Sequence, residues 1–438
     1  MARADWPLFR GPNGNGIANA LLLPDKIGTN NIAWAADLPG RGLSSPIIIG
    51  DRVFVTSASG PKQERLHVIC FNAKDGSKRW ERQFWATGRT LAHEKTCVAA
   101  PTPASDGERI FAIYSSNDLV CLDLDGNLVW LRGLTRDYPN ASNSLGMSSS
   151  LTVADGVLIA MVENDGDSFT AGIDAKTGVN RWKLSRPRTA NWTSPMLFKS
   201  GDTTHVLLQS SKGIVAVEPA TGRIVWQYTD GASTIPSATV SDGVVYVPSH
   251  GVTALQPQPD GQSPKQLWRS GQLSPSTPSP VILNQKVFTL NNAGVLSCGD
   301  ATDGKRLWQL RTKGPYSATP VGAGNLLYCV NEKGLLQVID TAAPEGAVLS
   351  ELDLGKTILS TPTHIRCASK QVCSAALLPI PTPKAKFLSL NSVHSNTRRR
   401  SATSPARIAK NTWPWPRQSK PSNSKRASST KITRASRR

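Results

Sequence analysis

The 438-residue sequence lacks the cysteine patterns of a disulfide framework or a zinc site. Its seven cysteines include no adjacent pair and no Cys-x-x-Cys spacing. Every apolar run is shorter than the roughly 18 residues of a membrane-spanning helix, so we predict no membrane span. The sequence also has no Gly-x-Ser-x-Gly, P-loop or His-Glu-x-x-His motif. No catalytic residue and no metal site are therefore predicted.

Acidic residues are absent from the last part of the chain. Residues 365–438 hold 17 of the 50 Lys and Arg residues and none of the 31 Asp and Glu residues. The rest of the chain, with 33 basic and 31 acidic residues, is nearly neutral, although the formal net charge is +19. The basic character thus belongs to a tail and not to the main domain.

A turn followed by a strand that ends on tryptophan recurs along most of the sequence. Examples are AKDGSKRW at 73–80, AKTGVNRW at 175–182 and ATDGKRLW at 301–308. The tryptophans at 34, 80, 130, 182, 226, 268 and 308 are 46, 50, 52, 44, 42 and 40 residues apart. A period of about 40 to 45 residues with four short strands per unit is typical of a β-propeller blade. Since one blade cannot bury both of its faces, neighbouring blades must stack around an axis.

The repeat predicts an all-β propeller of eight four-stranded blades, of which the last is incomplete; seven blades is the alternative count. Blades one to seven occupy 45–84, 99–132, 148–184, 193–228, 234–269, 276–310 and 316–352. An eighth blade begins at 359–363, where the pattern stops. A lone strand at 31–38 has the character of a fourth strand, so we expect it to close the ring by joining the two ends of the propeller. The predicted domains are an irregular leader at 1–30, the propeller at 31–363 and a tail at 364–438.

Polar loops gather on one face of the predicted propeller. Loops between second and third strands share a face with the connections between blades, and this set is elaborated in blades one to three. Long polar loops on a rigid scaffold are frequent binding sites. The candidate ligand-binding residues in these loops are Arg89, Thr90, His93, Lys95, Asn117, Asp118, Asn140, Asn143, Asp167 and Ser168. Simple solvation of the loops is the alternative interpretation.

The repeat and the opening residues resemble those of a known family. The repeat over 31–363 resembles that of the pyrroloquinoline-quinone-like (PQQ-like) propeller family. The shared signals are Ser/Thr-Pro, Asp-Gly and Asp-x-x-Gly-x-x-x-Trp. The leader WPLFRGPNGNG at 6–16 and the loops at 88–90 and 140–147 resemble bacterial, planctomycete-type members. The resemblance implies a single fold, the β-propeller. It leaves two alternative functions, because this fold occurs both in enzymes and in scaffold proteins.

One function implied by the resemblance is that of a PQQ- and calcium-dependent alcohol or sugar dehydrogenase. Such enzymes are longer and use a vicinal Cys-Cys disulfide, which this sequence lacks. The other is a cofactor-free scaffold similar to the outer-membrane assembly lipoprotein BamB. We expect the second: a non-catalytic, extracytoplasmic or periplasmic propeller that binds a protein or polymeric ligand through the loops of blades one to three, with no cofactor. Ala2-Arg3-Ala4 resembles the end of a signal peptide, although the chain as written contains no complete one.

The basic tail has three interpretations. It is a disordered segment, a nucleic-acid-binding arm through Arg398-Arg399-Arg400 and Trp413-Pro414-Trp415, or the result of a lost reading frame. We favour the last because the repeat stops in the middle of a blade. Nucleic acid is accordingly not an expected partner of the propeller.

Overall fold

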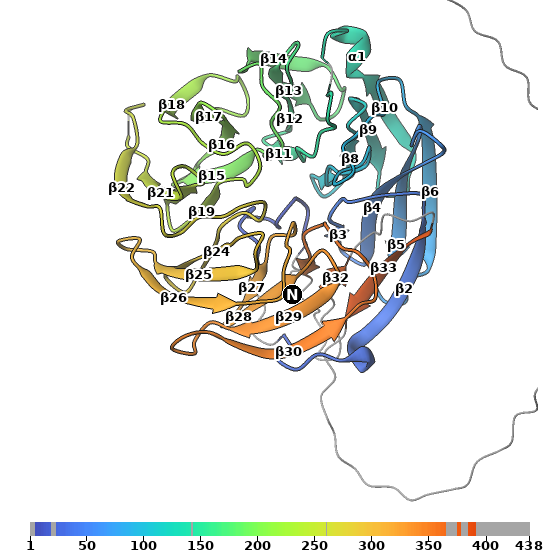
Figure 1. Ribbon diagram of the computed structural model, residues 1–438. Coiled ribbons are helices and arrows are strands. Elements are labelled where there is room, and N and C mark those ends of the chain that lie inside the picture. The colour runs from blue at the N-terminus through green and yellow to red at the C-terminus, as the bar shows by residue number, and fades with distance from the viewer. Residues whose placement is uncertain are drawn as a thin grey trace, which may run out of the picture. The chain divides into compact units, whose positions relative to one another are not determined.

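The structure is a ring of small antiparallel sheets, seen along the ring axis in Figure 1. The computed structural model describes residues 5–18, 23–141, 143–259, 261–364, 375–377 and 384–390. These residues form eight sheets, seven of four strands and one of five. All of them belong to one compact unit, residues 1–393. The β-propeller prediction is confirmed.

Blades one to four follow the predicted order of strands, the first innermost and the fourth outermost. Blade one contains β3 Ile47–Ile49, β4 Arg52–Ser59, β5 Arg65–Asn72 and β6 Lys78–Trp85. Blade two contains β7 Ala104–Ser105, β8 Arg109–Ile113, β9 Asp118–Asp123 and β10 Leu128–Gly133, followed by the short helix α1 Leu134–Asp137. Blade three contains β11 Thr152–Ala154, β12 Val157–Val162, β13 Phe169–Asp174 and β14 Asn180–Ser185. Blade four contains β15 Met196–Ser200, β16 Thr203–Ser210, β17 Gly213–Val217 and β18 Ile224–Tyr228.

Blades five to seven repeat this arrangement, and blade seven gains one strand from the leader. Blade five contains β19 Thr239–Ser241, β20 Val244–Val247, β21 Val252–Gln256 and β22 Lys265–Ser270. Blade six contains β23 Val281–Leu283, β24 Lys286–Leu290, β25 Val295–Asp300 and β26 Arg306–Arg311. Blade seven contains β27 Val321–Ala323, β28 Leu326–Val330, β29 Leu335–Asp340 and β30 Ala347–Asp353, with β1 Ile17–Ala18 parallel to β27.

The tryptophan at the end of most repeats holds one blade against the next. Trp130 donates from Nε1 to the carbonyl of Ala175 in the following blade at 3.1 Å. Its ring covers Gly178, where a Cβ would lie only 2.8 Å from the indole. Trp34, Trp80, Trp182 and Trp268 make the corresponding bond to the next blade. The repeated Gly-x-x-x-Trp spacing therefore encodes contacts between blades as well as a turn within each blade.

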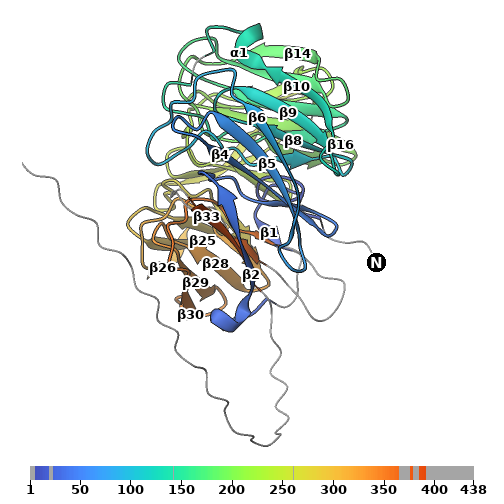
Figure 2. The ribbon, with the colours of Figure 1, turned by 90° about the vertical axis from the view of Figure 1, so that its right-hand side faces the viewer.

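The eighth blade joins the two ends of the propeller, as the lone strand predicted. Strand β2 Ile32–Pro39 pairs antiparallel with β33 Lys384–Leu390, and β32 Ala375–Leu377 and β31 Thr363–His364 complete the sheet. Figure 2 shows β2 and β33 side by side. Two strands thus lie beyond the predicted domain limit at 363, where the sequence no longer shows the repeat. The interpretations of the tail beyond residue 390 concern residues outside the described part of the chain.

The leader crosses the middle of the ring, where Figure 1 shows it in dark blue. Trp6 bridges to Ile48 of blade one, and the carbonyl of Gly16 accepts a hydrogen bond from the amide of Gly322 in blade seven at 2.9 Å. Between these points Arg10 is only 1% exposed and reaches blade five. The leader was predicted to be irregular. Its described residues are irregular apart from η1 Thr29–Asn31 and β1, and part of the leader lies inside the ring.

The described cysteines behave as small hydrophobic residues. Cys70, Cys97, Cys121, Cys298 and Cys329 are buried and unbonded. Burial raises the pKa of the Cys70, Cys97, Cys121 and Cys329 thiols to about 12 and that of Cys298 to about 11. These thiols are therefore protonated and unreactive at neutral pH.

Candidate functional site

The loops between second and third strands and the connections between blades lie together on one face. In blade two, Ser115 donates from its backbone to Val98 at 2.8 Å, and Leu134 donates to Asn117 at 2.9 Å. Between neighbouring blades, the His93 amide donates to Leu145 at 3.0 Å, and the Asp167 amide donates to Asn140 at 3.1 Å. The elaborated loops of blades one to three therefore form one connected surface.

A cavity of about 440 Å³ opens on the axis of the ring. Its lining includes one or more residues from each connection between blades, and Phe9 from the leader. Thirteen of the lining residues carry hydroxyl groups: Ser45, Thr96, Thr102, Ser148, Ser150, Ser194, Ser237, Thr277, Ser279, Ser317, Thr319, Ser360 and Thr361. The others are Phe9, Leu43, His93, Lys95, Ala100, Leu145, Trp192, Ile235, Asn292 and Leu359. No Asp or Glu is among these residues. We call this cavity the axial cup.

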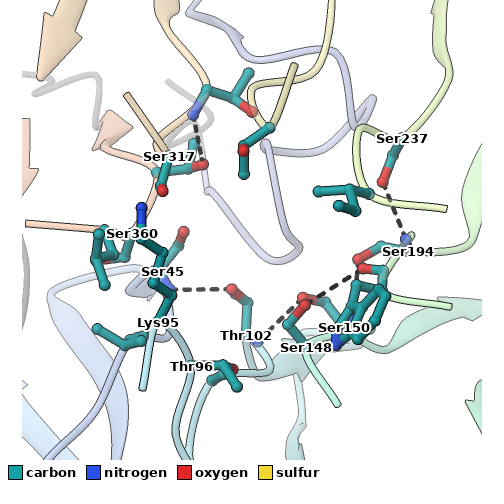
Figure 3. A pocket seen from close by; sticks show the side chains of 18 of the residues that line it. Ser45, Lys95, Thr96, Thr102, Ser148, Ser150, Ser194, Ser237, Ser317 and Ser360 are labelled. Atoms are coloured by element: carbon teal, nitrogen blue, oxygen red, sulfur yellow. Dashed lines mark hydrogen bonds between the residues drawn. The ribbon is translucent and has the colours of Figure 1, made fainter. Parts of the chain in front are cut away.

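The hydroxyl groups form an ordered ring around the axial cup (Figure 3). The backbone amide of Ser45 donates to Thr102 Oγ1 in the next blade at 3.0 Å, and the Thr102 amide does the same to Ser150 Oγ. The series continues through Ser194, Ser237, Ser279, Thr319 and Thr361, with amide-to-hydroxyl distances of 3.0 to 3.1 Å. Each of these seven hydroxyls thus links two blades at their inner ends.

Of the predicted binding residues, two line the axial cup. His93 and Lys95 are both exposed and come from the connection between blades one and two. Lys95 Nζ lies 3.4 Å from Glu332 Oε2, and Glu332 also accepts a hydrogen bond from Ser317 at 2.7 Å. The ion pair of Lys95 with Glu332 therefore stands at the mouth of the axial cup, with Lys95 beside Ser45 and Ser360 (Figure 3).

Three other predicted residues line a second cavity. Arg89, Asn117 and Asn143 border a space of about 310 Å³ between the loops of blades one and two. Arg89 is exposed. The Asn117 and Asn143 side chains are 1% and 6% exposed and bond to each other at 2.7 Å. The sequence predicts one loop surface for these residues together with His93 and Lys95, whereas the structure divides them between two cavities.

Several predicted residues are used to hold the loops. The buried Asp118 carboxylate accepts hydrogen bonds from Thr87 N, Thr87 Oγ1 and Ser116 Oγ at 2.6 to 3.2 Å. Ser168 Oγ donates to Pro187 at 2.7 Å. Thr90, Asn140 and Asp167 belong to the same loops but line neither the axial cup nor the second cavity. A ligand-binding role for all ten predicted residues stays a prediction.

Sequence reasoning missed the hydroxyl ring and the contribution of the leader. The signal for the ring was visible, because Ser or Thr stands directly before the proline that opens most blades. We interpreted that pattern only as the start of a strand. No local signal places Phe9 in the axial cup, since its position depends on contacts of the leader with distant blades.

Blade one contains a serine–histidine–glutamate chain that the sequence analysis also missed. Ser59 Oγ lies 2.7 Å from His67 Nε2, and His67 Nδ1 lies 2.9 Å from Glu81 Oε1. This order of contacts is that of a nucleophile, a base and an orienting acid. However, His67 is only 3% exposed, and Ser59, His67 and Glu81 line neither the axial cup nor the second cavity. We therefore assign this chain a structural role.

The described residues contain no group of three or more His, Cys, Asp or Glu side chains arranged to hold a metal ion. They also contain no helix that is both long and apolar enough to cross a membrane.

Comparison with known proteins identifies the family. The family model described as outer membrane protein assembly factor BamB matches residues 26–145, 85–250 and 248–349. These overlapping matches span most of the propeller and more than half of the chain. The chain belongs to this family of PQQ-like repeat propellers. The resemblance found in the sequence is confirmed.

Relatives of this BamB-family propeller include enzymes as well as assembly factors. A polyvinylalcohol dehydrogenase of a Pseudomonas species is 24% identical over 49% of this chain and 39% of its own length. The outer membrane protein assembly factor BamB of Moranella endobia is 24% identical over 51% of this chain and 55% of its own length. The chain thus covers 39% and 55% of the lengths of these two curated relatives.

The likeness in structure extends over nearly the whole chain. The quinohemoprotein alcohol dehydrogenase of Comamonas testosteroni superposes with a TM-score of 0.67, covering 92% of this chain and 83% of the enzyme at 13% identity. Identity at this level shows a common fold and no more.

Proposed function

We propose that this BamB-family propeller is a non-catalytic, extracytoplasmic protein that binds a protein or polymeric ligand on the loop face of blades one to three. The family description, outer membrane protein assembly factor, supports both the location and the binding role. The observation that carries the proposal is the connected loop surface, in which the connections of blades one and two are hydrogen-bonded to each other.

Exposed apolar side chains on this surface and beside it support binding. On the surface, Leu91 is 56% exposed and Leu145 is 46% exposed; Ile235, in the connection between blades four and five, is also 46% exposed. Leu145 and Ile235 stand at the axial cup, together with Lys95 and His93. Exposed apolar groups surrounded by polar residues are typical of protein interaction sites.

Site-specific photo-cross-linking in cells tests the proposal. A photoreactive amino acid at Leu91 or Leu145 should cross-link to one and the same partner. Val179 and Leu307 are equally exposed, at 64% and 50%, but lie in a turn between third and fourth strands and in the outermost strand β26. They are matched control positions that should not capture this partner. Equal capture from all four positions, or none from Leu91 and Leu145, would contradict the proposal.

A quinoprotein dehydrogenase is the second candidate function, favoured by the dehydrogenases among the relatives. The residues of the axial cup do not fit it. Calcium prefers several oxygen ligands that include carboxylates, and no Asp or Glu lines the axial cup. Titration with PQQ and calcium, followed by quinone absorbance, tests this alternative. Saturable one-to-one binding would overturn the non-catalytic proposal.

A further inference from the structure

The seven hydroxyls that link neighbouring blades donate to no group among the described residues, whereas Ser148, Thr277 and Ser317 of the lining already donate hydrogen bonds. Each of the seven linking hydroxyls accepts a backbone N–H from the preceding blade, as at Thr102, Ser150 and Ser194. A hydroxyl carries one donor besides its acceptor lone pairs. Accepting a hydrogen bond polarises the O–H group and makes it a better donor. The lining therefore offers a ring of O–H donors to whatever enters the axial cup.

Three further hydroxyls of the lining have no hydrogen-bond partner among the described residues. Ser45 Oγ, Thr96 Oγ1 and Ser360 Oγ are buried atoms without a partner among the described residues. Ser45 and Ser360 are 2% and 4% exposed, and both side chains lie beside Lys95 in Figure 3. An unsatisfied buried polar group costs stability unless a ligand completes it. These hydroxyls therefore mark one side of the axial cup as a place for a hydrogen-bond acceptor.

The charges and the apolar residues indicate what kind of acceptor fits. The lining contains Lys95 and His93 and no Asp or Glu. Lys95 pairs with Glu332 at 3.4 Å, so an incoming carboxylate competes with Glu332 for the ammonium and adds the hydrogen bonds of the free hydroxyls. Leu145, Ile235 and Trp192 add apolar surface to the same lining. A volume of about 440 Å³ lies within the range of about 300–1,000 Å³ that small ligands occupy, and is enough for a few side chains.

We propose that the axial cup binds an acidic side chain of an extended partner segment, whose neighbouring apolar residues contact Leu145 and Ile235. The O–H groups of Ser45, Thr96 and Ser360 and the ammonium of Lys95 hold the carboxylate. This inference rests on the proposed function, because it specifies how the partner of the loop face is recognised. Small free carboxylates could make the same hydrogen bonds. The experiment below distinguishes binding of a free carboxylate from binding of a peptide.

Isothermal titration calorimetry on the full chain tests the proposal with two matched peptides. The probes are acetyl-Leu-Glu-Leu-Glu-Leu-amide and its glutamine counterpart, acetyl-Leu-Gln-Leu-Gln-Leu-amide. The acidic peptide should bind at one site, and the neutral peptide should bind at least about tenfold more weakly, because charge-assisted hydrogen bonds are about twice as strong as neutral ones. Glutarate, as a free dicarboxylate, should compete only at much higher concentration.

Two variants tie the binding to the axial cup. Ser45→Ala and Ser360→Ala remove hydroxyls that have no protein partner among the described residues. Each variant should weaken binding of the acidic peptide about five- to tenfold. Neither should lower the urea midpoint, because no hydrogen bond of the folded chain is lost. Thr289→Val is the matched control: Thr289 Oγ1 is also buried and without a partner in the described part of the chain, but it does not line the axial cup. It should leave peptide binding unchanged.

The possible results separate this inference from the proposed function. Equal affinity for both peptides, or none for either, overturns the inference, whereas the proposed function stands if Leu91 and Leu145 still cross-link a partner. Glutarate that binds as tightly as the peptide overturns the assignment to a partner segment. If Thr289→Val lowers the affinity for the acidic peptide as much as Ser45→Ala does, the assignment of the peptide to the axial cup is also overturned. Failure of the cross-linking as well would overturn both proposals.

Discussion

Arg10 Nη1 donates a hydrogen bond to Thr239 Oγ1 at 2.8 Å, across 229 residues of sequence. Arg10 Nη2 also donates to the Ala238 carbonyl at 2.6 Å. No carboxylate pairs with this buried guanidinium among the described residues, and burial lowers the pKa of Arg10 to about 9. The contact fastens the leader to blade five inside the ring and, through the adjacent Phe9, completes the axial cup.

Replacement of Arg10 should therefore depend strongly on the size of the new side chain. Arg10→Ala leaves an internal void and should lower the free energy of unfolding by about 2–4 kcal/mol. Arg10→Met fills much of the space and removes an unpaired buried charge, so it should cost at least about 1 kcal/mol less than Arg10→Ala. Urea denaturation of both variants measures the difference between their free energies of unfolding. A larger loss in Arg10→Met would show that the hydrogen bonds of Arg10 outweigh the cost of burying its charge.

Two glycines with nearly the same backbone separate blade packing from backbone strain. Gly178 and Gly243 have φ angles of +74° and +76°. A Cβ on Gly178 would lie 2.8 Å from the Trp130 ring, whereas a Cβ on Gly243 would meet nothing within 4 Å. Gly243→Ala should cost about 1–2 kcal/mol for the left-handed conformation. Gly178→Ala should cost about 1–3 kcal/mol more, because it also pushes the indole away. Equal urea midpoints would contradict this account of the repeat.

The buried ion pair between Glu163 and Arg186 supports the loops of blades three and four. Glu163 Oε1 lies 2.5 Å from Arg186 Nε, and Asn191 donates to Oε2 at 2.9 Å. Burial raises the pKa of Glu163, and the charge of Arg186 opposes that rise. Arg186→Met strands the carboxyl group and should cost about 3–5 kcal/mol.

The double variant Glu163→Gln/Arg186→Met checks the cause of that loss. It removes both charges, so it should recover part of the stability lost in Arg186→Met. A double variant less stable than Arg186→Met, in the same thermal or urea measurement, would contradict the explanation by a stranded charge.

Stability should fall between pH 7 and pH 5 because of the buried His67 and the partly buried His205. Burial lowers the pKa of His67 below its ordinary value, although the hydrogen bond to Glu81 opposes this; burial also lowers the pKa of His205. Below about pH 6.5 the unfolded chain binds protons that the folded chain does not, so stability decreases as the pH falls from about 6.5 towards the folded pKa values. Above this window both histidines are neutral in both states and contribute no pH dependence.

Denaturation midpoints at about pH 7.5 and about pH 5.5, on either side of the ordinary histidine pKa, measure the effect. His67→Gln should reduce the difference between the two midpoints, and His67→Gln/His205→Gln should reduce it further. Each comparison is made within one variant, so a general loss of stability does not affect it. An unchanged difference in the double variant would assign the pH dependence to other groups.

The loop face makes a separate prediction through its exposed cations. The triple variant Arg89→Ala/His93→Ala/Lys95→Ala should reduce cross-linking of the partner from Leu91 at least about tenfold. Its unfolding temperature should stay close to that of the wild type, because these side chains are exposed and surface ion pairs such as Lys95–Glu332 contribute only about 0–1 kcal/mol. Undiminished cross-linking would place the contact elsewhere.

The repeat was enough to predict the propeller and how its ring closes. The spacing of the tryptophans predicted the blades, and the lone strand around Trp34 predicted that the ends of the propeller meet. Both depend on a local pattern repeated along the chain, so they can be recognised without any knowledge of distant contacts. The pattern failed only at β32 and β33, whose residues do not show the repeat.

Which side chains face the site depends on the assembled ring. Asn117, Asp118 and Asn143 stand in polar loops, but their burial depends on neighbouring connections that the sequence does not place. Conversely, Phe9 and Ser360 are far apart in sequence but line the same cavity. They do so because the leader crosses the axis of the ring and the first strand of every blade begins near that axis. A cavity on an axis belongs to no single repeat; it exists only when all the blades are assembled.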